Sequence, residues 1–77
     1  MKVLIYTRNN CVWCDRAKNL LNSKNLKYDE IDLSDDISRE NFYKNFNNSI
    51  KTMPQIFIND ERIGGYEALV EYLNGQE

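Results

Sequence analysis

Two cysteines separated by two residues lie where an apolar segment gives way to a segment with helical spacing. The apolar segment, residues 3–6, reads Val-Leu-Ile-Tyr and predicts a buried strand. Beyond it, apolar side chains recur on one face of a predicted helix over about residues 12–24, namely Cys14, Ala17, Leu20 and Leu21. Cys11 and Cys14 are therefore expected at the start of a helix that directly follows a strand.

The rest of the chain continues the alternation of strands and helices. Expected strands cover residues 2–6, 26–33 and 61–63, and Pro54 leads into a further strand within residues 52–58. Expected helices cover residues 12–24, 36–47 and 66–74. Asn25 is a plausible end for the first helix, and Asn59-Asp60 predicts a tight reversal between the last two strands. A strand, a helix and a strand in succession imply a parallel pair, so an α/β fold in the order β-α-β-α-β-β-α is expected.

Composition and length narrow the class of protein. The chain has 77 residues, a net charge of −2 and no histidine. It contains no linker, repeat or low-complexity segment, so one domain spanning residues 1–77 is expected. The charge argues against a nucleic-acid partner, and no apolar run approaches the length of a membrane span. The first residues are too short for a signal-peptide core, which makes the cytoplasm the expected compartment.

A Cys-x-x-Cys pair has three common explanations. Half of a zinc site needs further ligands, and this chain has no histidine and no other cysteine. A packing coincidence would place two small apolar side chains at a helix start by chance. Thiol–disulfide exchange is favoured, because a helix N-terminus stabilises the thiolate that acts as nucleophile. In a reducing compartment, a lone cysteine pair is more often catalytic or metal-binding than a structural crosslink.

Three segments in this order resemble the glutaredoxin family. Residues 5–18 resemble its active-site segment, residues 52–58 its threonine-x-cis-proline strand, and residues 63–66 its glycine pair before the last helix. The resemblance covers nearly the whole chain and implies a thioredoxin-like fold with a four-stranded mixed sheet flanked by three helices. The short length is similar to that of compact, phage-encoded glutaredoxins.

The resemblance implies a glutathione-dependent thiol–disulfide oxidoreductase. Cys11 would be the catalytic nucleophile, and Cys14 would resolve the mixed disulfide into a Cys11–Cys14 disulfide that glutathione reduces. Glutathione would serve as reductant, with no bound cofactor and no metal. Partners would be disulfide-containing or glutathionylated proteins, with ribonucleotide reductase a family-level candidate, and the protein would act as a monomer without nucleic acid or membrane.

The family also implies a glutathione-binding set. Met53, before a cis Pro54, would offer its backbone to the cysteinyl part, and the glycine pair would open the last helix to the γ-glutamyl carboxylate. Arg8 and Lys51 are candidates for the glycyl carboxylate. The complete expected set is Arg8, Trp13, Lys51, Thr52, Met53, Pro54, Gly65, Tyr66 and Glu67. Trp13 is also expected to form an exposed wall for docking proteins.

Departures from the family pattern and a second resemblance keep two alternatives open. Val12 stands where glutaredoxins often have proline, Glu67 where many have aspartate, and Ile50 where a polar contact to glutathione is common. One alternative is a small redoxin that is reduced by thioredoxin reductase and donates electrons to ribonucleotide reductase, a group that residues 7–12 also resemble. The other is a non-enzymatic carrier of a glutathione-ligated iron–sulfur cluster.

Overall fold

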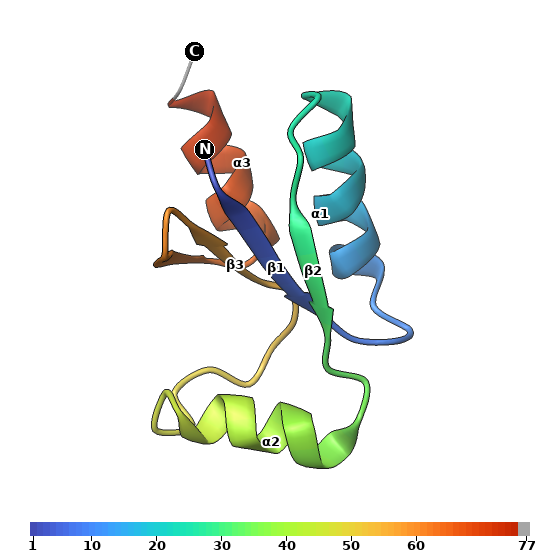
Figure 1. Cartoon of the computed structure of the whole chain (residues 1–77), viewed down its shortest axis with the longest axis vertical. Coiled ribbons are helices and arrows are strands. Elements are labelled where there is room, and N and C mark those ends of the chain that lie inside the picture. Colours follow the sequence, from blue (N-terminus) through green and yellow to red (C-terminus); the bar gives the residue numbers. More distant parts are fainter. Residues whose placement is uncertain (76–77) are drawn as a thin grey trace.

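The computed structural model describes residues 1–75, which form one sheet and three helices. Helices α1 and α3 lie together along the sheet, whereas α2 lies apart, at the end where β1 and β2 finish (Figure 1). The strands are β1 (Val3–Thr7), β2 (Asp29–Asp32), β3 (Gln55–Ile58) and β4 (Glu61–Gly64), and the helices are α1 (Val12–Ser23), α2 (Asp36–Lys44) and α3 (Tyr66–Asn74). The predicted element order is therefore confirmed.

The sheet has the strand order β2-β1-β3-β4. Strand β1 runs parallel to β2, as the β-α-β order predicts, and antiparallel to β3, where Tyr6 is paired with Gln55. The predicted reversal at Asn59-Asp60 is confirmed, because both residues have positive φ and they connect the antiparallel strands β3 and β4. This topology places the end of β1 beside the start of β3.

The main core lies between the sheet and helices α1 and α3. It is built from one face of β1 and β3 and from the apolar stripes of the two helices, namely Val3, Ile5, Ala17, Leu21, Ile56, Ile58, Leu69 and Leu73. On β1, Tyr6 contacts the aromatic ring of Phe42 in α2, with ring centroids 4.5 Å apart, and also that of Phe57 in β3. Alternate residues of β1 thus serve two different layers, as the period of a strand requires.

The structure corrects the predicted bounds of two elements. Strand β2 is shorter than the predicted 26–33, and every residue in it is exposed, including Ile31 at 40%. It lies at the edge of the sheet, and Leu26 before it packs against the core from outside the strand. Helix α2 ends at Lys44 rather than 47, because Asn47 and Asn48 adopt positive φ and leave the helical conformation.

Local signals set the other boundaries. Asn25 has a φ of 57° just after α1, which confirms it as the end of that helix. Asp35 caps α2 by accepting a hydrogen bond from the backbone N–H of Ser38 at 2.9 Å. This bond lowers the pKa of the Asp35 carboxyl, because it favours the charged form. Within residues 1–75, no helix is long and apolar enough to cross a membrane.

Candidate active site

The two cysteines lie at the N-terminus of α1 and are joined by a disulfide. Cys11 is the N-cap residue, and its Sγ accepts a hydrogen bond from the backbone N–H of Cys14 at 3.1 Å. Cys11 is partly exposed, whereas Cys14 is only 1% exposed. The pair is thus asymmetric: one sulfur is accessible and receives an N–H donor, while the other faces the core.

The segment before β3 approaches the first cysteine from the opposite side. The Sγ of Cys11 lies 3.6 Å from the carbonyl oxygen of Met53, and the Met53–Pro54 peptide bond is cis, as the family resemblance implies. The side-chain amide of Gln55 donates to the carbonyl oxygen of Thr52 at 3.0 Å, and Arg62 donates to the Gln55 side chain at 3.2 Å. These bonds tie the segment beside the disulfide to the sheet.

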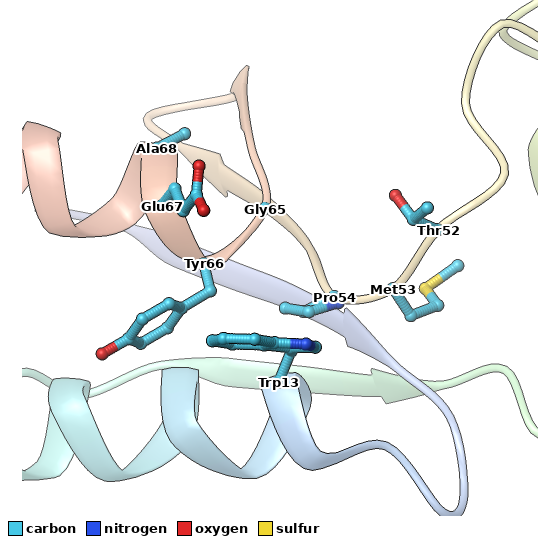
Figure 2. Close-up of a pocket in the computed structure, with 8 residues that line it drawn as sticks. All are labelled: Trp13, Thr52, Met53, Pro54, Gly65, Tyr66, Glu67 and Ala68. Atoms are coloured by element: carbon cyan, nitrogen blue, oxygen red, sulfur yellow. The ribbon is translucent and has the colours of Figure 1, made fainter.

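A cavity of about 410 Å³ opens between this segment, α1 and the start of α3 (Figure 2). It is lined by Trp13, Thr52, Met53, Pro54, Gly65, Tyr66, Glu67 and Ala68. The structure therefore brings together every residue of the expected glutathione set except Arg8 and Lys51. The volume of this cavity suits a small peptide ligand.

The indole of Trp13 forms one wall of this cavity. Figure 2 shows the ring between α1 and the side chains of Pro54 and Tyr66. Its centroid lies 5.5 Å from that of Tyr66, and the guanidinium carbon of Arg16 lies 4.8 Å from the indole centroid. Trp13 is nevertheless 50% exposed. The ring is thus held between an aromatic and a cationic neighbour while keeping a large accessible surface.

The N-terminus of α3 forms the far end of the cavity. Gly65 is its N-cap residue and has no side chain that could accept hydrogen bonds from the first-turn N–H groups. Those groups carry the partial positive charge of the helix terminus and favour an anion. Glu67 contributes a carboxylate to the same first turn. The end of the cavity thus presents backbone donors beside a carboxylate, which suits a group that carries both signs of charge.

Arg8 and Lys51 line a separate cavity, also of about 410 Å³, beside α2. The other residues that line it are Arg39, Glu40, Tyr43, Lys44 and Asn48. Arg39 is held in place, because its guanidinium donates to the carbonyl oxygens of Leu33 and Ser34 at 3.0 and 3.1 Å. The structure therefore places the two predicted cations together, but in a neighbouring cavity rather than in the one beside Trp13.

The hydrogen bonds that join Thr7, Lys18 and Glu30 were not predicted from the sequence. The hydroxyl of Thr7 donates to Glu30 at 2.6 Å, and the ammonium of Lys18 donates to the same carboxylate oxygen at 3.2 Å. One signal was available: Lys18 follows Cys14 by four residues, and such residues share one side of a helix. The link from Lys18 to β2 gave no signal in the sequence, because it depends on how α1 packs. Ala68, in the first turn of α3, was also missed as a cavity residue.

The acidic segment beside Lys18 is not arranged as a cation site. Within residues 1–75, no group of three or more His, Cys, Asp or Glu side chains could hold a metal ion. Instead, Asp32 accepts a hydrogen bond from the backbone N–H of Ser34 at 2.7 Å. Hydrogen bonds from Ser34 lower the pKa of the Asp32 carboxyl, and the charge of Lys18 acts in the same direction. Asp32 thus forms part of a turn, and Asp15 and Glu30 pair with Lys18.

Comparison with known proteins places this geometry in a family. The glutaredoxin family profile matches residues 3–63. Glutaredoxin 1 of Rickettsia conorii is 39% identical over 71 residues, which cover 90% of this chain and 69% of that protein. Glutaredoxin 3 of Escherichia coli is 40% identical over 68 residues, covering 87% and 80%. The crystal structure of Glutaredoxin 1 from Francisella tularensis in complex with cacodylate is 41% identical, superimposes with a TM-score of 0.88 and matches 97% of this chain and 94% of its own. Together with the Cys-x-x-Cys disulfide and the mixed four-stranded sheet, these matches show that the chain belongs to the glutaredoxins, glutathione-dependent thiol–disulfide oxidoreductases with a thioredoxin-like fold.

Proposed function

We propose that Cys11 is the nucleophile of the exchange and Cys14 the resolving thiol. The Cys11 thiolate attacks one sulfur of a disulfide, forms a mixed disulfide and releases the other sulfur as a thiolate. The Cys14 thiolate then attacks Cys11, closes the Cys11–Cys14 disulfide and releases the second thiol. Two glutathione molecules return the pair to the reduced state and leave as glutathione disulfide, so electrons and protons balance.

The observation that carries this proposal is the asymmetry of the two sulfurs. Cys11 is accessible, and its Sγ receives the Cys14 N–H at 3.1 Å, a donor that favours the thiolate. Cys14 is buried at 1% exposure, so a substrate in solution reaches Cys11 first. Access and stabilisation of the anion thus coincide on the same sulfur.

We propose that glutathione lies along the cavity beside Trp13, with its sulfur at Cys11. Its cysteinyl backbone would pair with Met53, and its γ-glutamyl carboxylate would meet the first-turn N–H groups of α3, with the ammonium facing Glu67. Support comes from the lining of the cavity, which joins Met53 and Glu67 in a single space. The glycyl carboxylate would extend toward Arg8 and Lys51 in the neighbouring cavity.

We further propose the setting in which this chemistry operates. Residues 1–77 would act as one domain and as a monomer in the cytoplasm, where a reducing glutathione pool regenerates the dithiol. Protein substrates would be disulfide-containing or glutathionylated proteins, with ribonucleotide reductase a candidate. The similarity to phage-encoded glutaredoxins remains a prediction from the sequence.

The test is a coupled assay with glutathione, glutathione reductase and NADPH, using the mixed disulfide of 2-mercaptoethanol and glutathione as substrate. Turnover in this assay supports glutathione as the reductant. Turnover only with thioredoxin reductase would instead assign the protein to the small redoxins. Visible absorbance after anaerobic purification, with no turnover in either assay, would indicate a cluster carrier.

Variants of the two cysteines test the assigned roles. Cys11→Ser should abolish all exchange, because the accessible nucleophile is lost. Cys14→Ser should retain glutathione-dependent reduction of mixed disulfides and lose the dithiol reduction of protein disulfides. Equal loss in both assays for Cys14→Ser would contradict the division of roles.

A further inference from the structure

A charged network reaches α1 one helical turn after the resolving cysteine and has no part in the proposed exchange. Lys18 on α1 donates to Glu30 on β2 at 3.2 Å, and Thr7 at the end of β1 donates to the same oxygen at 2.6 Å. The Nζ of Lys18 also lies 3.9 Å from a carboxylate oxygen of Asp15. The side chains of Lys18 and Glu30 are 27% and 33% exposed, so solvent screens this network only in part.

The network shares its face of the sheet with Cys14. Thr7 is 2% exposed and alternates with Val3 and Ile5, which pack in the core that α1 covers. Cys14 is on the buried side of α1 and is one helical turn from Lys18. Glu30 is paired with Ile5 in the parallel ladder, so its side chain leaves the sheet on the same face.

We propose that Lys18 and Glu30, with Thr7 as their anchor, form a positioning network for the resolving thiol, so that their charges set the rate at which Cys14 attacks the mixed disulfide. This inference rests on the proposed roles of the cysteines and adds a control on the second step. A buried thiol resists ionisation, and a neighbouring ammonium favours the thiolate. Lys18 is the cation on the buried side of α1 nearest in sequence to Cys14.

The two charges of the pair have opposite effects on the same thiolate. Lys18 is paired with Glu30 and also interacts with Asp15 and Asp32, so its removal leaves these carboxylates without their cation. Removal of the Glu30 charge leaves the positive charge of Lys18 less neutralised, which favours the Cys14 thiolate. A roughly tenfold change in thiolate population is offset by about a threefold opposite change in nucleophilicity, so the resolving rate changes about threefold.

The experiment follows the resolving step directly. Reduced protein is mixed with the mixed disulfide of 2-mercaptoethanol and glutathione, the reaction is quenched with acid, and mass spectrometry follows conversion of the Cys11 mixed disulfide into the Cys11–Cys14 disulfide. Lys18→Gln should slow this conversion about threefold, and Glu30→Gln should accelerate it by a similar factor. Lys18→Arg should restore the wild-type rate, because it retains the charge.

Three controls separate this inference from loss of structure and from failure of the proposed function. Lys27→Gln removes an exposed positive charge far along the chain from the cysteines and should leave the rate unchanged. In the Cys14→Ser background, Lys18→Gln should leave attack by Cys11 within about twofold of the parent. Failure of the wild-type protein to form either the Cys11 mixed disulfide or the Cys11–Cys14 disulfide would instead reject the proposed function itself.

The sign of the two effects decides the inference. A network with only a structural role predicts that Lys18→Gln and Glu30→Gln impair the protein in the same direction, with lower thermal stability. Changes of the resolving rate in the same direction for both variants, or no change in either, would overturn the proposal. Opposite changes in variants that stay folded would support it.

Discussion

The glycine pair before α3 allows the stability of the fold to be separated from the shape of the site. Gly64 has a φ of 125°, and a Cβ added there would lie 3.0 Å from the Cβ of Ala68. Gly65 has a φ of −96°, and an added Cβ would lie 3.5 Å from the carbonyl oxygen of Pro54, an ordinary contact. Gly64→Ala should therefore destabilise the fold, whereas Gly65→Ala should retain it and alter the cavity.

The expected loss in the free energy of unfolding for Gly64→Ala follows from two opposing contributions. Forcing alanine into this backbone region costs about 1–3 kcal/mol, and the smaller conformational entropy of the unfolded chain returns about 0.4–1 kcal/mol. Close contact with Ala68 adds to the cost. A net loss of about 2 kcal/mol lowers the melting temperature of a domain this small by roughly 8–16 °C.

Urea unfolding followed by circular dichroism measures this difference. With a denaturant slope of about 1 kcal/mol per molar, the midpoint of Gly64→Ala should fall by about 2 M. That of Gly65→Ala should change little, because the lower entropy of the unfolded chain offsets the preference for glycine over alanine at an N-cap. The activity assay should show the reverse order: Gly65→Ala raises the KM for glutathione, because its methyl group enters the cavity lining. An unchanged midpoint for Gly64→Ala would refute this reasoning.

A double-mutant cycle separates backbone strain from steric overlap. Ala68→Gly removes the methyl group that faces position 64, at a cost of about 1 kcal/mol in the helix. If overlap contributes, Gly64→Ala combined with Ala68→Gly is less destabilised than the sum of the single variants. Additivity within about 0.5 kcal/mol would assign the whole cost to the conformation of residue 64.

Three further predictions concern the core, the helix cap and the wall of the cavity. Leu21→Ala should cost about 2–5 kcal/mol in urea unfolding, because Leu21 is fully buried and a cavity remains. The pKa of Asp35 is lowered in the folded state by its bond from Ser38, so its stabilisation is present above the ordinary Asp pKa and is lost as pH falls through the folded value. Asp35→Asn should therefore lose less stability than the wild type between about pH 5 and pH 2, measured by urea midpoints. Arg16→Gln should shift the fluorescence of Trp13, the only tryptophan, and raise the KM for glutathione about twofold, since an exposed cation–π contact contributes about 0.5–1 kcal/mol.

Much of the architecture was predictable because its signals are local. The apolar run at residues 3–6, the helical stripe through Ala17 and Leu21, and the turn at Asn59-Asp60 each specify an element without reference to distant segments. The position of the cysteines at a strand–helix junction follows from the same signals. The order of the elements then leaves few possible topologies.

The errors arose where a property depends on a neighbouring element. Strand β2 was predicted from a loose alternation that includes Leu26 and Ile31, but Ile31 is exposed at the edge of the sheet and Leu26 lies outside the strand. An edge strand has a neighbouring strand on one side only, and the sequence of the strand alone does not show whether it lies at an edge. The hydrogen bonds that join Thr7, Lys18 and Glu30 were missed for the same reason, since three separate elements bring these residues together.

The site depends on the pairing of β1 with β3 more than on either segment alone. Tyr6 is paired with Gln55, so the chain that leads from β1 to Cys11 begins beside the chain that leads from Pro54 into β3. This pairing brings the Sγ of Cys11 within 3.6 Å of the Met53 carbonyl oxygen, although 42 residues separate them. A register shift of two residues keeps the same faces buried but moves one segment by about 7 Å along the other, a distance that would separate the sulfur from the cavity. The buried residues of β1 and β3 therefore determine reactivity as well as stability, because they fix this register.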